Sequence, residues 1–256
     1  MATTPTDPDL GSVLGKAVAV LHAFTVDDHE LSLAALVERT GLPKTSVYRI
    51  AGDLVRYRLL DRTVLGYRLS GGLFELGMRA SVERSLLELA MPYLQDLYER
   101  THETVHLGIR EGREVVYVAK IAGRGQAASP SRTGGRMPLH CTAIGKVLLA
   151  WADDDLRRDV LTGPLERRTP HTIVAPGRVA QQLDAAIEAG VAFEREESAL
   201  GLQCVAAPVL DADDRPIAAI SVTGPVGRFR PEQHVDAVRA AAQGLGTLVA
   251  RRRSLH

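Results

Sequence analysis

The sequence predicts an α+β protein with two domains, a winged helix-turn-helix domain followed by a domain with an antiparallel sheet. Helices joined by a short turn and followed by a hairpin are expected within the first 70 residues. Further along, strand pairs are flanked by helices. The chain has 256 residues, 45% of them hydrophobic and 24% charged, which is enough for two domains of ordinary globular composition.

The first three helices are predicted by apolar periodicity and by the residues at their ends. Apolar residues recur every three or four positions over 12–24, and Ser12 is placed to cap that helix. Ser32 opens a second helix, which ends at Gly41 because glycine readily adopts the left-handed conformation. Pro43 suits the first turn of a third helix. The residues expected on its buried face are Val47, Ile50, Ala51 and Leu54.

A two-stranded hairpin, or wing, is predicted after the third helix. Residues 59–63 and 66–69 are rich in aliphatic and aromatic side chains, and Gly66 lies in the turn between them. Gly52 does not fit its helix, because glycine in a helix interior costs about 1 kcal/mol relative to alanine.

The rest of the chain predicts helices and paired strands. Residues 70–72 interrupt the pattern before a short helix over 73–80 and a longer helix over 82–100. Further elements are expected as strands at 104–109 and 115–121, helices at 143–152 and 179–189, strands at 202–210 and 217–223, and a helix at 234–253. Strand pairs with helices at both ends indicate an antiparallel α+β domain.

The charge distribution points to a local basic patch. The chain has 31 lysines and arginines and 31 acidic residues, so any nucleic-acid binding must depend on such a patch. Residues 39–68 carry seven cations and only two acids. On the third helix, Lys44, Thr45, Tyr48 and Arg49 lie outside the apolar face, where they can reach a major groove. Scattered cations usually form a solvated surface, but the helix, turn, helix and hairpin order favours DNA binding.

Composition also bears on the compartment. Cys141 and Cys204 are too few for a disulfide framework and lack the spacing of a zinc or redox site, which fits a reducing cytoplasm. Residues 1–10 do not resemble a secretory signal, and no apolar run is long enough to cross a membrane. We therefore expect a cytoplasmic protein without a membrane partner.

Four blocks of sequence resemble the IclR-type bacterial transcriptional regulators, and the resemblance extends from about residue 12 to residue 253. The blocks are TGLPKTSVYR at 40–49, GYRL at 66–69, PLHCTAIGK at 138–146 and EESALGLQCVAAP at 196–208. The resemblance implies an N-terminal winged helix, a linker helix and a C-terminal effector domain similar to a GAF module. It also implies homodimers, often paired into homotetramers, that bind palindromic operators in duplex DNA and respond to small organic acids.

On this basis the chain divides into a disordered tail over 1–11, a DNA-binding domain over 12–70, a linker helix over 71–81 and an effector-binding domain over 82–256. The residues expected to contact DNA are Lys44, Thr45, Ser46, Tyr48, Arg49 and Arg68. We favour a repressor, although the choice between repressor and activator depends on where the operator lies relative to the promoter.

The second domain has the features of a ligand pocket. Thr142 can cap a helix that leaves the N–H groups of Ala143, Ile144 and Gly145 available to an anion. Side chains alternate between the two faces of a strand, so Ser221 and Thr223 share one face of the strand predicted at 217–223. Each residue taken singly is more often an ordinary buried group, but the cluster favours a pocket. The resemblance places the effector against Ala143, Ile144, Glu194, Leu202, Cys204, Ser221 and Thr223, and also against Ser129 and Thr142, whose match to the family is weaker.

An enzyme with Cys204 or Cys141 as nucleophile is the alternative, with His140, His171 or His106 as base. No nucleophile motif surrounds either cysteine, and His102 and His106 lack a third metal ligand. Phosphate-binding glycine loops are also missing from the sequence. The sequence therefore predicts a regulator that is not an enzyme and has no cofactor, metal or catalytic residue.

Overall fold

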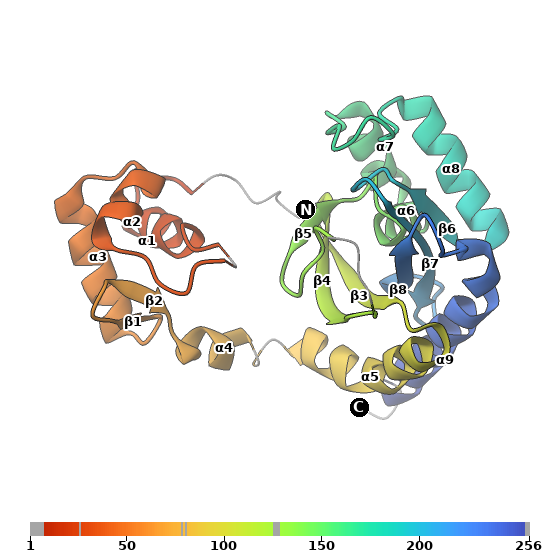
Figure 1. The fold of residues 1–256 in the computed structure, drawn as a ribbon, viewed down its shortest axis with the longest axis horizontal. Helices are drawn as coiled ribbons and strands as arrows, with labels where there is room; N and C mark the ends of the chain where they lie inside the picture. The colour runs from red at the N-terminus through yellow and green to blue at the C-terminus, as the bar shows by residue number, and fades with distance from the viewer. Residues whose placement is uncertain (1–7, 26, 78, 80, 125–128, 254–256) are drawn as a thin grey trace. The chain divides into compact units, whose positions relative to one another are not determined.

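A computed structural model of the chain describes residues 8–25, 27–77, 79, 81–124 and 129–253 (Figure 1). It contains two compact units, Met1–Arg84 and Ser85–His256. The mixed fold, with an N-terminal helix-turn-helix unit and a C-terminal curled antiparallel sheet, confirms the predicted class. Most of the predicted tail, residues 1–7, lies outside the described residues. None of the described helices is long and apolar enough to cross a membrane.

The first unit begins with three helices, α1 (Val13–His22), α2 (Leu33–Thr40) and α3 (Lys44–Arg56). The predicted caps are confirmed, since the hydroxyls of Ser12 and Ser32 each accept a backbone N–H from the first turn. Gly41 ends α2 with a φ of 65°. Pro43 precedes α3 as its N-cap, one position earlier than predicted. The core of this unit contains Val20, Leu31, Leu36, Leu42, Val47, Ile50, Ala51, Leu54, Leu60 and Tyr67.

The hairpin that follows, β1 (Leu60–Arg62) and β2 (Tyr67–Leu69), is also as predicted. Its turn is fixed to the helical part of the unit, because Gly66 lies against the backbone of Leu31. A Cβ at Gly66 would stand 2.1 Å from the Leu31 carbonyl oxygen, so only glycine allows this close approach. The hairpin is therefore held in a defined position relative to α2 and α3.

The expected break at residues 70–72 is wrong, because α4 (Gly71–Gly77) already includes both glycines. The hydroxyl of Ser70 accepts the N–H of Gly72 at 3.0 Å, which supports a helix start there despite the low helix propensity of glycine. The predicted end of this helix falls on residues 78 and 80, outside the described residues. The next helix, α5 (Ser81–Thr101), includes Pro92, so it lacks one internal backbone hydrogen bond.

The second unit is built on a six-stranded antiparallel sheet with the order β5-β4-β3-β8-β7-β6. Its strands are β3 (Thr104–Glu111), β4 (Glu114–Ile121), β5 (Arg136–Pro138), β6 (Ala192–Arg195), β7 (Leu202–Leu210) and β8 (Pro216–Pro225). Its later helices are α6 (Ala143–Ala150), α7 (Asp154–Thr162), α8 (Pro176–Ala189), the short 3-10 helix η1 (Pro231–His234) and α9 (Val235–Arg253). Four of these elements, β5, β6, α7 and η1, were not predicted.

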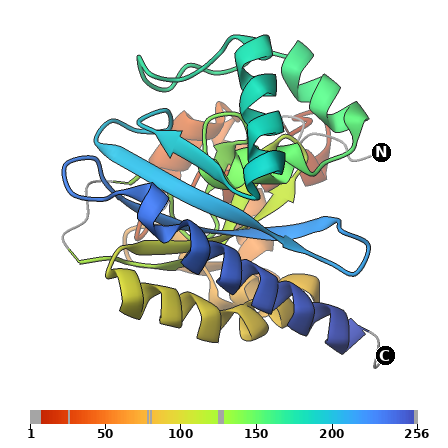
Figure 2. The same ribbon diagram turned by 90° about the vertical axis from the view of Figure 1, so that its right-hand side faces the viewer.

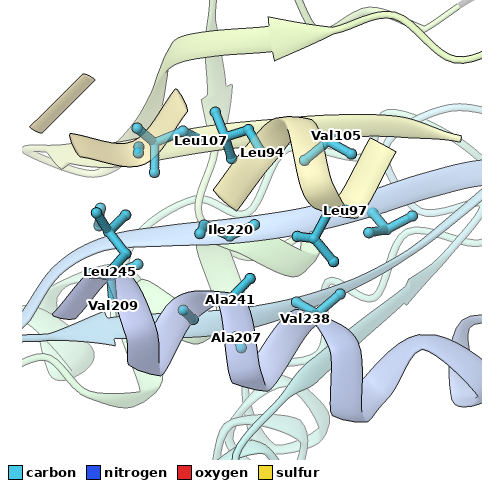
Figure 3. Close-up of a cluster of buried hydrophobic side chains, with 14 of the residues drawn as sticks. Leu94, Leu97, Val105, Leu107, Ala207, Val209, Ile220, Val238, Ala241 and Leu245 are labelled. Atoms are coloured by element: carbon cyan, nitrogen blue, oxygen red, sulfur yellow. The ribbon is translucent and has the colours of Figure 1, made fainter. Parts of the chain in front are cut away.

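Helices cover both faces of this sheet (Figure 2). Helices α5 and α9 lie side by side along one face and form an apolar core with strand residues such as Val105, Leu107 and Ile220 (Figure 3). The other face packs against α6 and α8. Because strand side chains alternate between faces, His106 and Ser221 point away from the first core and toward α6. The fold thus separates an apolar face from a more polar one.

The mismatch at Gly52 leads to a prediction about stability. A Cβ at this exposed position in α3 would meet no atom within 4 Å, so Gly52→Ala is expected to stabilise the first unit by about 1 kcal/mol. Gly41→Ala is the matched control, because its φ of 65° strains any side chain and the change should destabilise the same unit. Hydrogen exchange of the α3 amides measures both effects. Equal shifts in the two variants would contradict this explanation.

Candidate functional site

The outward face of α3 carries the residues predicted to contact DNA. Lys44, Thr45, Tyr48 and Arg49 are exposed, and Ser46 is half-buried. The buried residues on the opposite face of α3 hold the helix against the rest of the unit. One helix face therefore presents two cations, a hydroxyl and a phenol to the solvent, groups that suit base edges and phosphates.

Outside α3, two of the cations in the basic patch are paired with acidic residues. Arg39 forms an ion pair with Asp28 at 2.5 Å, and this guanidinium keeps the pKa of Asp28 well below its usual range. Arg68 on the hairpin pairs with Asp61 at 3.0 Å. By contrast, Lys44 and Arg49 have no acidic partner among the described residues. The unneutralised positive charge of the predicted contact set is therefore concentrated on α3.

The nine residues predicted to bind an effector surround one cavity of about 20 Å³ in the second unit. They come from α6, β6, β7 and β8 and from the segment before β5. These residues are Ser129, Thr142, Ala143, Ile144, Glu194, Leu202, Cys204, Ser221 and Thr223. The structure thus brings together positions that are up to 94 residues apart in the sequence.

Strand register explains why these side chains meet. Glu194 on β6 is opposite Cys204 on β7, and Cys204 is opposite Thr223 on β8. In the neighbouring row, Ser221 is opposite His106 on β3. Cross-strand partners lie about 5 Å apart, so the two rows form a continuous polar strip beneath α6.

His106 is the principal lining residue that the prediction missed. One ring nitrogen, Nε2, lies 2.7 Å from the Ser131 hydroxyl, while Nδ1 lies 3.4 Å from Ser221 Oγ and 3.5 Å from Thr223 Oγ1. Burial, with a further effect from Lys120, lowers the pKa of His106 to about 3. The imidazole is therefore neutral at physiological pH. Alternation along its strand, with Val105 and Leu107 in the apolar core, was the signal for its inward position.

The start of α6 supplies backbone donors to the cavity. Thr142 is the N-cap, as predicted, and its hydroxyl accepts the Gly145 N–H at 3.0 Å. The expectation that Gly145 offers a free N–H is therefore wrong, because the cap itself takes that donor. Two of the three predicted donors, the N–H groups of Ala143 and Ile144, have no acceptor within the described part of the chain.

Glu194 supplies the cavity with a carboxyl group. Its Oε1 accepts backbone N–H groups of Glu197 at 2.7 Å and Ser198 at 3.0 Å. Its Oε2 is buried and has no hydrogen-bond partner among the described residues. Burial raises the pKa of Glu194, while the two backbone donors and the Cys204 thiol act in the opposite direction. A ligand group that bonds to Oε2 would satisfy this atom.

The cysteines do not have the environment of nucleophiles. Cys204 Sγ lies 3.0 Å from Thr223 Oγ1, and burial raises the pKa of its thiol. Burial likewise raises the pKa of Cys141 to about 12. Across the described residues, no hydrogen bond joins either cysteine to a histidine, and no group of three potential metal ligands is found. Both thiols stay protonated at neutral pH, which argues against thiolate catalysis.

The lowered pKa of His106 predicts a loss of stability in acid. The unfolded chain takes up a proton near pH 6.5 and the folded chain only near pH 3, so stability falls with decreasing pH between these values. The loss between pH 7 and pH 5 is about 2 kcal/mol. Denaturation followed by fluorescence of Trp151, the single tryptophan and a residue of this unit, measures it. His106→Asn should reduce this pH dependence, and an unchanged slope would contradict the assignment.

Comparison with known proteins gives matches over nearly the whole chain. Residues 13–63 match the model of the IclR helix-turn-helix domain, and residues 78–247 match that of the bacterial transcriptional regulator IclR C-terminal domain. The transcriptional regulator KdgR of Escherichia coli is 35% identical over 229 residues, which cover 88% of this chain and 87% of KdgR. The transcriptional repressor AllR of the same species is 28% identical, over 91% of this chain and 89% of AllR.

Solved structures of IclR-family proteins have the same fold as this chain. An IclR homologue from Microbacterium hydrocarbonoxydans, crystallised with 4-hydroxybenzoate, superposes with a TM-score of 0.87 at 29% identity and covers 94% of this chain and 100% of its own. The Thermotoga maritima IclR gives a TM-score of 0.76 at 26% identity, over 93% and 98% of the two chains. The matched domains and relatives are regulators of transcription and not enzymes.

Proposed function

The chain belongs to the IclR family of bacterial transcriptional regulators, and we propose that it binds an operator through α3 and releases it when a small organic acid enters the second unit. In this proposal, residues 12–70 bind DNA, residues 71–81 form a linker, and residues 82–256 bind the ligand. The observation that supports the ligand half best is the meeting of nine predicted residues around one cavity.

The chemistry of the cavity favours a hydroxy acid. At α6, the N–H groups of Ala143 and Ile144 and the positive end of the helix suit a carboxylate. Oε2 of Glu194 would instead repel a second carboxylate and accept a hydrogen bond from a hydroxyl. Hydroxyls of Ser221 and Thr223 add directional hydrogen bonds. The 4-hydroxybenzoate held by the Microbacterium relative has a carboxylate and a hydroxyl at opposite ends, as this arrangement requires.

The small cavity supplies a basis for the switch. A volume of about 20 Å³ accommodates little more than one water molecule, so a hydroxy acid must widen the space between α6 and the sheet. A ligand that binds only the widened form shifts the population toward it. Operator affinity changes if the widened form differs in its affinity for DNA.

The other parts of the proposal concern the oligomeric state, the cellular location and the direction of regulation. One winged helix contacts only a few base pairs, so we infer a homodimer or homotetramer on a palindromic operator. We also infer that the protein acts in the cytoplasm. Repression is supported by a relative that is named a repressor. Sedimentation of the purified chain and footprinting relative to the transcription start site test these two points.

Ser221→Ala tests the ligand half. Loss of one hydrogen bond should weaken binding of 4-hydroxybenzoate about 3- to 10-fold in calorimetry while ligand-free operator binding stays unchanged. Thr247→Ala is the matched control, because this hydroxyl on α9 bonds to the Gln243 carbonyl and does not line the cavity. DNA from upstream of the chain's own gene serves as the operator probe. Ligand binding that leaves operator affinity unchanged would contradict the switch.

A further inference from the structure

A second, larger cavity lies between α8, β6 and the segment before α8. This α8 cleft has a volume of about 710 Å³ and shares no lining residue with the cavity beneath α6. Its polar lining includes Lys146, Arg167, Arg178, Gln182, Arg195 and Glu197. A volume of this size accommodates a small metabolite.

The start of α8 gives the cleft a positive end. The helix has no side-chain cap and no acidic residue in its first turn, where Arg178 stands instead. A cation at this position is unfavourable, because a helix N-terminus carries a partial positive charge. Arg178 has no acidic partner among the described residues, whereas Arg195 is paired with Glu232. Arg178 is exposed, so an anion bound in the cleft would be attracted by its guanidinium and by the helix end together.

Arg167 adds donors to the same cleft. Its Nη1 is held by the Thr172 carbonyl at 3.1 Å and lies 3.4 Å from that of Pro170. These contacts fix the guanidinium but leave its charge without an acidic partner in the described chain. Two guanidinium groups therefore line the cleft without neutralisation.

The same cleft also contains unsatisfied acceptors. Glu197 is 4% exposed, and its Oε2 is buried without a hydrogen-bond partner among the described residues. Gln182, one turn of α8 beyond Arg178, likewise has a buried Oε1 without a partner there. Buried acceptors are normally bonded, so these two atoms call for donors. The cleft thus combines cations for an anionic group with acceptors for hydroxyl groups.

We propose that the α8 cleft binds a small polyhydroxylated carboxylate, at a site separate from the cavity beneath α6. Arg178 and Arg167 hold the carboxylate at the start of α8, and Gln182 Oε1 and Glu197 Oε2 accept hydrogen bonds from its hydroxyl groups. A carboxylate without hydroxyls leaves the buried acceptors unsatisfied, and an uncharged polyol gains no attraction from the arginines. Recognition therefore requires both kinds of group in one molecule.

Calorimetry on the full chain tests this with three probes: D-gluconate, hexanoate and sorbitol. We expect D-gluconate to bind and the other two to bind at least about tenfold more weakly. Arg178→Gln and Gln182→Leu should each reduce D-gluconate affinity by roughly tenfold. Arg215→Gln, which changes an exposed arginine in the β7–β8 turn, is the matched control and should have no effect.

Ser221→Ala separates the two sites, since it changes the cavity beneath α6 and should leave D-gluconate binding intact. D-gluconate binding that is lost in Ser221→Ala but kept in Arg178→Gln would overturn the proposal. Equal binding of D-gluconate and hexanoate would do the same. No binding of D-gluconate, with a change of sedimentation in Arg178→Gln, would assign the cleft to contact with a second copy of the chain.

Discussion

Replacing Lys146 by methionine is expected to destabilise the second unit by about 3–5 kcal/mol. Lys146 lies on α6 and its side chain is 1% exposed. Its ammonium donates to the Glu197 carboxylate and to the Phe193 carbonyl oxygen, the latter at 3.2 Å. Methionine has a similar length but no charge, so the variant leaves the Glu197 carboxylate buried without its cation. Such an uncompensated charge is more costly than the loss of the ion pair itself.

The double variant Lys146→Met with Glu197→Leu distinguishes the two effects. Removal of both charges leaves no unpaired ion, so we expect it to recover most of the stability lost in Lys146→Met. Trp151 ends the same helix, and its fluorescence during urea denaturation reports on this unit. Arg158→Met, which removes an exposed ion pair with Asp155, is the control and should change stability by less than about 1 kcal/mol. A double variant no more stable than Lys146→Met would refute the explanation.

This ion pair also shows where prediction from sequence ends. Lys146 ends the segment 138–146 that resembles the IclR family, yet nothing in its neighbours along the chain indicates a buried charge. Its partner lies 51 residues away on the loop after β6. Local periodicity determines which face of a helix is apolar, but α6 is buried on all sides, so that signal is lost. Only the tertiary fold pairs the two charges.

The elements that were predicted share strong local signals. Ser12, Ser32 and Gly41 mark helix ends through interactions within four residues, and alternation marks the strands β3 and β4. Strands β5 and β6 have three and four residues, too few for alternation to be distinguished from chance. They form because each pairs with the exposed edge of a longer strand, β5 with β4 and β6 with β7. The same reasoning applies to His106, whose inward position was available from alternation but whose hydroxyl partners come from distant segments.

Ion pairs within the first unit change which cations we expect to contact DNA. The sequence counts Arg68 and Arg49 equally, whereas in the structure Asp61 pairs with Arg68. A phosphate that contacts Arg68 competes with this exposed ion pair, which is worth at most about 1 kcal/mol. We therefore rank Arg49 and Lys44 above Arg68 as contacts.

Arg49→Ala is expected to weaken binding to the operator by about 1–3 kcal/mol, or roughly 5- to 150-fold. Arg49 is exposed on α3, one helical turn from Thr45, and its guanidinium has no acidic partner among the described residues. An arginine that reads guanine loses two hydrogen bonds on truncation, while a lysine that contacts phosphate loses mainly electrostatic attraction. Fluorescence anisotropy with labelled upstream DNA and a scrambled duplex of equal length measures both kinds of loss.

The two cations of α3 should differ in this assay. Arg49→Ala should reduce the preference for upstream over scrambled DNA, whereas Lys44→Ala should weaken binding to both and reduce the salt dependence by about one counterion. Arg68→Ala serves as the ion-paired control, and we expect it to have the smallest effect of the three because Asp61 already neutralises it. If Arg49→Ala binds upstream DNA as tightly as the unaltered chain, α3 is not the recognition helix. If instead all three variants lose affinity equally for both duplexes, the face binds DNA through its charge alone and the assignment of Arg49 to a base edge is wrong.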